Sequence, residues 1–236
     1  MRLYQFPFSP FAIKVRSAFT IKAVAVELVD ITLERYAELL RLNPRAKAPV
    51  LVDGERAVAD STVILAELET RCPDPPLVPR DPARRALTWL LEDWADESLY
   101  WFATYFQVRV TENMSLVRTL YARNYSGNVG EQVASQMTEI MREQTHQQGI
   151  GRKPLSEVET DLARHTQMLT DLLAGARFFG GTAPDLADCA LYGQARYLAR
   201  TPQGARLIVP PALGEWFRRM HTFDLAGVAL EPYAGQ

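Results

Sequence analysis

Two short segments place a hydroxyl or a carboxylate directly before a predicted helix, where such side chains can hold a ligand. Ser9 precedes Pro10, a proline that suits the first turn of a helix, and the pair Asp60–Ser61 opens another helical segment. The first peptide N–H groups of a helix lie at the positive end of its dipole, so an anionic group is favoured beside Ser61. Taken alone, each segment is more typical of ordinary helix capping.

The other residues with reactive side chains show no catalytic or metal-binding spacing. His146, His165 and His221 share no ligand spacing, so the sequence predicts no metal site. Cys72 and Cys189 lie far apart and neither belongs to a Cys-x-x-Cys pair, which argues against a disulfide framework or a zinc site. We interpret both cysteines as structural.

The composition is that of an ordinary folded domain and excludes several classes of partner. The chain has 236 residues, of which 47% are hydrophobic and 23% charged, with a formal net charge of -2. Acidic and basic residues are interspersed, so no patch for nucleic acid is predicted. No stretch approaches the roughly 20 apolar residues of a membrane span, and the start of the chain does not resemble a signal peptide. We expect a cytoplasmic protein that binds neither nucleic acid nor membrane.

The first seventy or so residues alternate between short extended runs and helical ones. The Asp53-Gly54 dipeptide joins two short apolar segments and predicts a tight hairpin. The whole segment predicts the order β-α-β-α-β-β-α, with these elements: Arg2–Phe6, Phe11–Lys22, Ala25–Ile31, Arg35–Leu42, Pro49–Val52, Arg56–Ala59 and Thr62–Arg71.

A proline-rich stretch from Cys72 to Pro82 follows and marks a boundary, since it cannot continue a helix. Beyond it the sequence predicts only helices: Ala83–Val108, Glu131–Gln147, Glu157–Leu173, Leu186–Ala199 and Pro211–His221. A loop is expected over Asn124–Gly130, and Ser156 with Glu159 predicts a capping box. We therefore expect two domains, residues 1–76 with an α/β fold and residues 83–236 with an all-α fold.

Four segments in this order resemble the landmarks of glutathione transferases. FPFSPFAIKVR resembles the first motif of the serine-type enzymes, the theta, zeta and related bacterial classes. NPRAKAPVLVDG resembles the family segment that contains a cis proline, and DSTVILAELE resembles its Glu-Ser-x-x-Ile segment. PDLADCALYGQ resembles the Ser/Thr-x-x-Asp cap of a buried helix, with Asp185 as the cap and Asp188 as its partner. The resemblance covers nearly the whole chain and implies a thioredoxin-like N-terminal domain followed by the family's helical domain.

The resemblance also implies a role for each matching residue. Ser9 falls in the catalytic position, where its hydroxyl donates a hydrogen bond to the thiolate of glutathione and does not act as a nucleophile. Ala48 offers its backbone to the cysteinyl part of glutathione beside a cis Pro49, while Asp60 and Ser61 hold the γ-glutamyl group. The expected glutathione site therefore consists of Ser9, Ala48, Pro49, Asp60 and Ser61.

The chain departs from the family pattern at three of these positions or beside them. Asp60 stands in place of the usual glutamate, Ala48 in place of valine, and Ala46 where a glycine is common. Phe11 stands where some relatives carry a cysteine, which argues against a cysteine-based mechanism. Aromatic residues concentrate along the helix from Ala83 and mostly form core, and only one or two of them are expected to line the pocket for the second substrate. The candidates for that pocket are Phe11, Tyr100, Trp101 and Tyr105.

These observations lead to one expected function and two alternatives. We expect a homodimeric glutathione transferase that conjugates glutathione, its co-substrate, to a small hydrophobic electrophile without a metal. The departures at positions 46, 48 and 60 leave open a non-catalytic binding or interaction protein of the same fold. The zeta-like first motif leaves open a glutathione-dependent isomerase.

Overall fold

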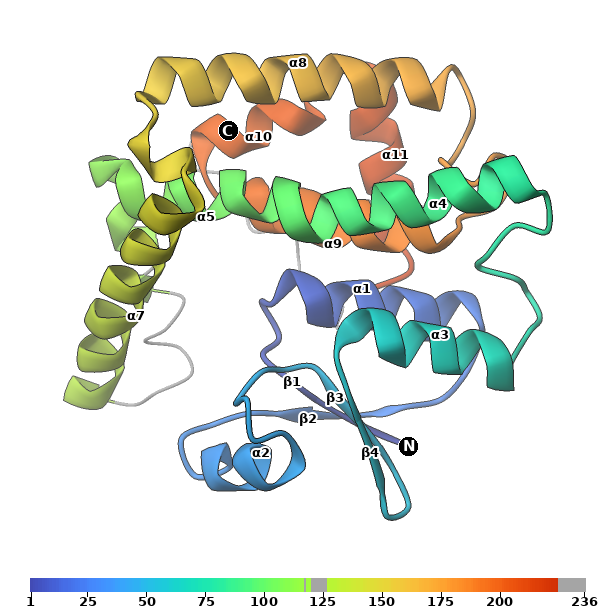
Figure 1. Cartoon of the computed structure of the whole chain (residues 1–236), viewed down its shortest axis with the longest axis horizontal. Helices are drawn as coiled ribbons and strands as arrows, with labels where there is room; N and C mark the ends of the chain where they lie inside the picture. The colour runs from blue at the N-terminus through green and yellow to red at the C-terminus, as the bar shows by residue number, and fades with distance from the viewer. Residues whose placement is uncertain (117, 120–126, 225–236) are drawn as a thin grey trace.

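A computed structural model describes residues 1–116, 118–119 and 127–224 of the chain (Figure 1). The N-terminal part contains a four-stranded sheet of order β2-β1-β3-β4. Strand β1 (Arg2–Gln5) pairs in parallel with β2 (Glu27–Asp30) and antiparallel with β3 (Val50–Asp53), which pairs antiparallel with β4 (Arg56–Ala59). The order of elements is the β-α-β-α-β-β-α order that the sequence predicts.

Helices cover both faces of this sheet. Helices α1 (Pro10–Ile21) and α3 (Ser61–Arg71) lie on the face that points to the rest of the chain, and α2 (Tyr36–Leu42) lies on the other face (Figure 1). Helix α1 is buried over most of its length because it packs on the sheet with one side and on the helical part with the other. It is the central element between the two halves of the molecule.

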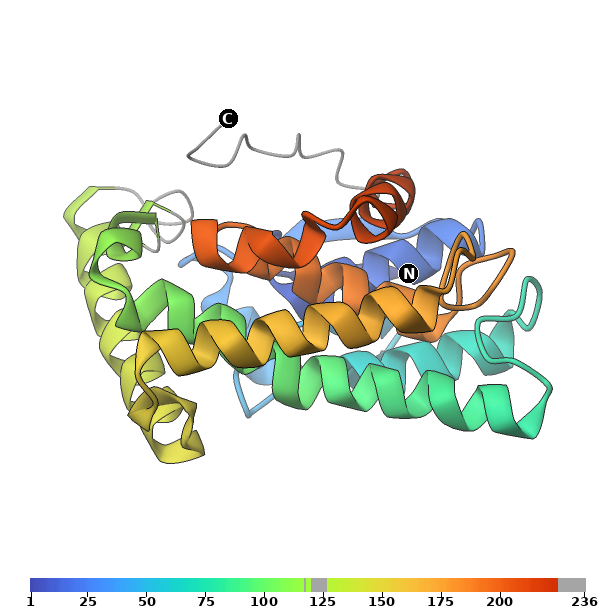
Figure 2. The ribbon, with the colours of Figure 1, turned by 90° about the horizontal axis from the view of Figure 1, so that it is seen from above.

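Among the described residues of the second half, every regular element is a helix, apart from one isolated β-bridge between Phe178 and Gly181. Figure 2 shows these helices from above. They are α4 (Pro82–Trp94), a π-helical turn (Ala95–Leu99), α5 (Tyr100–Arg109), α7 (Gly127–Gln148), α8 (Leu155–Leu173), α9 (Leu186–Leu198), α10 (Pro202–Ala205) and α11 (Pro211–His221), with short 3₁₀ turns at Thr111–Asn113, Ile150–Arg152 and Arg206–Ile208. The predicted fold class, thioredoxin-like followed by all-α, is confirmed. No helix among the described residues is long and apolar enough to cross a membrane.

Three predicted details differ from the structure. The helix expected over Ala83–Val108 is divided by the π-helical turn, whose wider hydrogen bonding no apolar periodicity reveals. The capping box at Ser156 is wrong: α8 begins at Leu155 after Pro154, so Ser156 already lies inside the first turn. The loop expected over Asn124–Gly130 is wrong for its last four residues, which begin α7, and its first three lie outside the described residues.

Helix α9 is the centre of the helical core, and its start is fixed by a buried acidic pair. Asp185 accepts the N–H of Asp188, and Asp188 accepts the N–H of Asp185, which confirms the predicted capping box. Asp188 also accepts the indole N–H of Trp216 at 2.7 Å. Burial and the neighbouring charge of Asp185 raise the pKa of Asp188 to about 7.

A single glycine lets α9 approach α1. A Cβ atom added at Gly193 would lie 2.4 Å from the carbonyl oxygen of Pro10. Any side chain at this position would force the two helices apart at the N-terminus of α1. The packing of the helical domain therefore bears directly on the residues around Ser9.

Candidate functional site

The sheet register brings the three predicted site segments to the same end of the sheet, where β1 and β4 finish and β3 begins. Tyr4 near the end of β1 pairs with Val50 at the start of β3, and Val50 pairs with Ala59 at the end of β4. The segments that follow β1, precede β3 and follow β4 therefore leave the sheet on the same side. These segments carry Ser9, the pair Ala48–Pro49 and the pair Asp60–Ser61.

Ser9 stands directly before α1, with Pro10 as the first residue of the helix. Its backbone is extended, with φ -67° and ψ 129°, and its N–H donates to the carbonyl of Phe6 at 2.9 Å. Its side chain makes no capping hydrogen bond to the helix. The partly exposed hydroxyl is therefore not used as the ordinary helix cap that the isolated motif would suggest.

The Ala48–Pro49 peptide bond is cis, as the resemblance implies. The turn before it is organised by Asn43, whose amide donates to the carbonyl of Lys47 at 2.7 Å and whose side-chain oxygen accepts the N–H of Arg45 at 3.1 Å. Ala46 in this turn has a φ of 53°, a conformation that glycine adopts more easily, which explains why glycine suits this position. Ala48 itself lies outside the β3 ladder, which begins at Val50.

Asp60 caps α3 and is held in an unusual backbone conformation. Its φ is 83°, and its Oδ1 accepts the N–H groups of Thr62 at 2.9 Å and of Val63 at 3.2 Å. The side chain is exposed, and Ser61 beside it is buried as the first residue of the helix. Strained non-glycine conformations of this kind cluster at ligand sites.

A buried charged cluster lies behind the start of α3. The ammonium of Lys14 in α1 donates to Glu92, to Asp96 at 2.6 Å and to the hydroxyl of Thr62 at 3.1 Å. The Thr62 hydroxyl in turn donates to Glu92 at 2.6 Å. Burial alone would lower the pKa of Lys14, but its attraction to Asp96 and Glu92 outweighs this, so the pKa is raised. Burial also raises the pKa of Asp96, which the charge of Lys14 only partly offsets.

Aromatic side chains from both halves of the chain meet near Ser9. The ring of Phe11 lies 5.4 Å from that of Tyr100, centroid to centroid, and Tyr100 contacts Trp101 at 5.2 Å and stacks on Tyr197 at 5.9 Å. Three of the four residues predicted for the second substrate are thus together. Tyr105 is used elsewhere, because its hydroxyl donates to the carbonyl of Lys153 at 3.0 Å.

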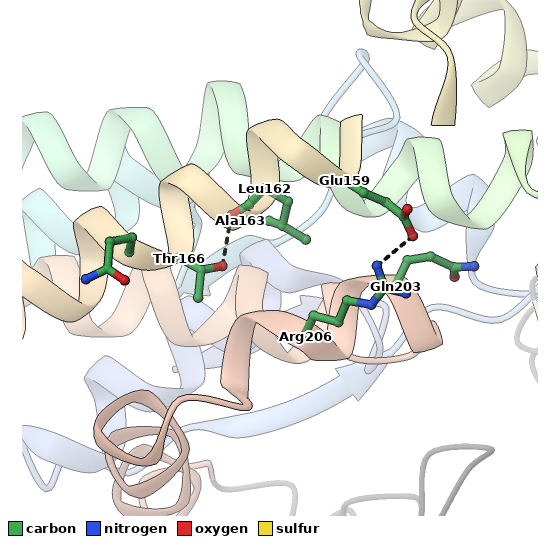
Figure 3. Close-up of a pocket in the computed structure, with 7 residues that line it drawn as sticks. Glu159, Leu162, Ala163, Thr166, Gln203 and Arg206 are labelled. Atoms are coloured by element: carbon green, nitrogen blue, oxygen red, sulfur yellow. Dashed lines mark hydrogen bonds and ion pairs between the residues drawn. The ribbon is translucent and has the colours of Figure 1, made fainter. Parts of the chain in front are cut away.

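A separate pocket of about 180 Å³ lies between α8 and the α10 segment (Figure 3). The guanidinium of Arg206 pairs with Glu159 across it at 2.8 Å, and none of the predicted site residues lines it. No three His, Cys, Asp or Glu side chains gather as possible metal ligands within the part of the chain that the structure describes.

A thioredoxin-like half with a cis proline at its sheet edge, followed by a helical half that packs on α1, defines the architecture of glutathione transferases. The sequence model for the glutathione S-transferase N-terminal domain matches residues 3–76, and the model for the C-terminal domain matches residues 145–219. Together the two ranges make up more than half of the chain. The chain belongs to the glutathione S-transferase family.

Individual relatives cover less of the chain. Glutathione S-transferase 1 of Dianthus caryophyllus is 39% identical over 93 residues, which are 38% of this chain and 42% of the relative. A probable maleylacetoacetate isomerase of Caenorhabditis elegans is 36% identical over 87 residues, which are 36% of this chain and 41% of that protein. The chain thus spans less than half the length of these curated relatives.

Solved structures extend the likeness of fold to the whole chain. A glutathione S-transferase of Methylobacterium radiotolerans, in complex with glutathione sulfonate, has a TM-score of 0.61 and is 24% identical. The match covers 100% of this chain and 96% of that chain. At this level of identity the likeness shows the fold.

For several residues that shape the site, the sequence motifs indicate no role. Lys14 and Arg16 belong to the Lys-Val-Arg run of the first motif. The structure buries both cations in α1, and a buried cation requires buried partners. Asn43 is the first residue of the segment NPRAKAPVLVDG. Arg200 and Tyr197 lie at the end of α9 and showed no signal, because only the tertiary fold brings them to the loop before Ser9.

Proposed function

We propose that this protein is a glutathione transferase in which Ser9 stabilises the thiolate of glutathione. The observation that carries the proposal is the common edge of the sheet, where Ser9, the cis Ala48–Pro49 peptide and the start of α3 leave the ladder together. Each has the chemistry for one part of the tripeptide. A helix N-terminus suits a carboxylate, a backbone segment outside the strand ladder suits a peptide, and a hydroxyl donor suits a thiolate.

The role of Ser9 follows from its free hydroxyl and from the helix behind it. Glutathione supplies the nucleophilic sulfur, and a thiol of ordinary pKa, about 8.5, is only a few per cent ionised near neutral pH. The Ser9 hydroxyl donates a hydrogen bond to the anion, and the N-terminus of α1 adds a favourable dipole. Each unit by which the thiol pKa falls corresponds to about 1.4 kcal/mol and increases the reactive fraction severalfold.

Asp60 and Ser61 hold the γ-glutamyl end in this proposal. Oδ1 of Asp60 is fixed by two N–H groups of α3, which orients the carboxylate as a partner for the ligand's ammonium. The hydroxyl and N–H of Ser61 at the start of α3 receive the ligand's carboxylate.

The second substrate is a small hydrophobic electrophile held against the aromatic face from the two domains. Phe11, Tyr100 and Trp101 form this face, with Tyr197 stacked behind Tyr100. Aromatic walls with few polar groups favour an apolar ligand.

The first test is glutathione binding by calorimetry, with Asp60→Ala as the site variant. Asp81→Ala is the matched control, because Asp81 also caps a helix, α4, by accepting the N–H of Arg84 at 2.9 Å. We expect wild-type binding in the micromolar to millimolar range that is lost in Asp60→Ala and kept in Asp81→Ala. Absence of wild-type binding would refute the function. Equal losses in both variants would show that only helix capping matters.

The test of catalysis uses Ser9→Ala and several standard electrophiles. We expect the conjugation rate at neutral pH to fall at least tenfold while glutathione still binds, because the anion loses its donor. A loss of twofold or less would remove Ser9 from the mechanism, and turnover with none of the electrophiles would favour the non-catalytic alternative.

A second candidate, glutathione-dependent isomerisation, is supported by the likeness to the probable maleylacetoacetate isomerase of Caenorhabditis elegans. It uses the same site but regenerates glutathione in each cycle. An assay with a cis-configured, conjugated keto acid that follows both isomerisation and free thiol separates the two functions: constant thiol supports isomerisation, and loss of thiol supports conjugation.

We propose that the protein acts as a homodimer in the cytoplasm. Three large apolar side chains are exposed on α3 and α4, namely Val63 (52%), Leu87 (43%) and Leu90 (67%), which suits a partner surface. The two cysteines are free thiols, in keeping with a reducing compartment. Light scattering on the purified protein measures the mass directly, and a monomer would contradict the dimer.

A further inference from the structure

The loop that presents Ser9 is held by two arginines through its backbone. Residues 6–9 join β1 to α1, and the N–H of Ser9 closes the turn on the carbonyl of Phe6 at 2.9 Å. Nη1 of Arg16 donates to the carbonyl of Pro7 at 3.1 Å, and Nη2 of Arg200 donates to the carbonyl of Phe8 at 2.9 Å. The two peptide groups immediately before Ser9 therefore each receive a hydrogen bond from a guanidinium.

Arg16 is itself fixed by a buried network. Its Nε and Nη2 donate to the two carboxylate oxygens of Asp224 at 2.8 and 3.3 Å, and its Nη1 donates to Gln5 at 2.6 Å. Asp224 also pairs with Arg196 of α9. A guanidinium bound in this forked manner has a single orientation, because both edges of its plane are occupied.

Arg200 reaches the loop from the other domain. It lies just after α9, and its guanidinium carbon is 5.7 Å from the centroid of the Phe8 ring and 5.2 Å from that of Tyr197. The side chain is thus hydrogen-bonded to the loop and also lies within cation–π distance of two aromatic rings. Arg196, which pairs with Asp224, lies four residues before Arg200. The loop contact of Arg16, which is supported by Asp224, and the loop contact of Arg200 therefore both depend on the C-terminal end of α9.

We propose that Arg16 and Arg200 are positioning residues that set the place of the Ser9 hydroxyl. This inference rests on the proposed role of Ser9. A hydrogen bond to a thiolate depends on donor placement to within about 0.5 Å, and the two guanidinium bonds hold the peptide groups directly before Ser9. The helical domain thereby controls the acidity of a thiol bound in the N-terminal domain.

Arg200→Met is the variant of choice, because it keeps the long apolar stem and removes the donor and the charge. Arg109→Met is the matched control: Arg109 also donates to a backbone carbonyl, that of Gly151 at 2.6 Å, within the helical domain. The readout is the pKa of the glutathione thiol at saturating ligand, followed by the ultraviolet absorbance of the thiolate.

Among the described residues, Arg16 and Arg200 are the charged groups that bond to the loop, and Asp224 behind it pairs with both Arg16 and Arg196.

The double variant separates positioning from direct attraction between Arg200 and the thiolate. We expect Ser9→Ala and Arg200→Met each to raise the thiol pKa by about one unit, and Arg109→Met to leave it unchanged. Because Arg200 acts through Ser9, Arg200→Met should add nothing in the Ser9→Ala background. Additive shifts would overturn the proposal, since they would mean a direct charge effect, and so would an unchanged pKa in Arg200→Met.

A second measurement keeps the inference testable without glutathione. In the free protein, hydrogen exchange of the Ser9 N–H, which is bonded to Phe6, should become at least tenfold faster in Arg200→Met and stay unchanged in Arg109→Met. Unchanged exchange in Arg200→Met would overturn the proposal. If the wild-type protein binds no glutathione, the proposed function fails, and the exchange result alone decides whether Arg200 fixes the loop.

Discussion

Replacing Lys14 by Met should strongly destabilise the protein, because Lys14 is the buried partner of two buried carboxylates. The Lys14 side chain is 1% exposed, and its partners Glu92 and Asp96 are 4% and 9% exposed. In Lys14→Met the two carboxylates remain buried beside each other without a cation. The loss in folding free energy arises mainly because the two carboxylates stay buried without a cation, and less because the hydrogen bonds themselves are lost.

The expected loss in the free energy of unfolding follows from the distance between the Lys14 ammonium and the Asp96 carboxylate. At 2.6 Å the Lys14–Asp96 attraction is about 6 kcal/mol for an effective dielectric constant of 20. Much of this offsets the cost of burying the charges, and removal of one member of a buried pair costs about 3 to 5 kcal/mol. We expect that loss in the free energy of unfolding, measured by urea denaturation at pH 8.

The pH dependence of the variant gives an independent check. Burial already raises the pKa of Asp96, and removing Lys14 takes away the charge that opposes this rise. A folded-state pKa above the unfolded one means that stability falls as pH rises between the two values. Lys14→Met should therefore recover part of its stability at pH 5 relative to the wild type.

The matched variant is Lys14→Met combined with Glu92→Gln and Asp96→Asn, which removes the unpaired charges. It should be more stable than Lys14→Met alone at pH 8. A loss below about 1 kcal/mol in Lys14→Met, or a loss that does not change between pH 8 and pH 5, would show that Lys14 does not neutralise two buried charges.

Three further predictions follow from single positions. Gly193→Ala should cost about 1 to 3 kcal/mol and lower conjugation, because its Cβ would lie 2.4 Å from the carbonyl of Pro10; an unchanged unfolding midpoint and rate would contradict this. Ala174→Gly at the end of α8, where φ is 44°, should stabilise by about 0.5 to 1 kcal/mol, seen as a higher melting temperature, whereas Ala163→Gly inside the helix should destabilise. A thiol reagent should modify Cys72 in the folded protein but reach Cys189 only after unfolding, because burial raises the pKa of that thiol well above its usual value and encloses it; two fast-reacting thiols would be inconsistent with the structure.

Much of the fold could be predicted from the sequence because its signals are local. The Asp53-Gly54 hairpin, the alternation of short strands and helices, and the Asp185–Asp188 cap each depend on residues close together in the chain, and each is present in the structure. The errors have local causes as well. A capping motif at Ser156 is indistinguishable in sequence from two polar residues inside a helix that begins one residue earlier.

The candidate site was only partly predictable. The motifs containing Ser9, Pro49 and Asp60 identified the three segments, and the sheet register brings them to one edge. Tyr105 shows the limit of such reasoning, because an aromatic residue in the right helix can face either the pocket or the core. Its hydroxyl donates to Lys153, a partner 48 positions away in the chain that no periodicity indicates.

The order of elements, the family and the chemical types at the site can be read from the chain alone, since these depend on periodicity, turn residues and short motifs. Three features emerge only from the folded molecule: the Ser9 hydroxyl is not a helix cap, Lys14 binds two buried carboxylates, and Arg200 reaches the Ser9 loop. These features could not be predicted because the residues involved lie far apart along the chain. Arg200 and Phe8 are 192 residues apart, and their contact exists only because α9 packs on α1 at a glycine.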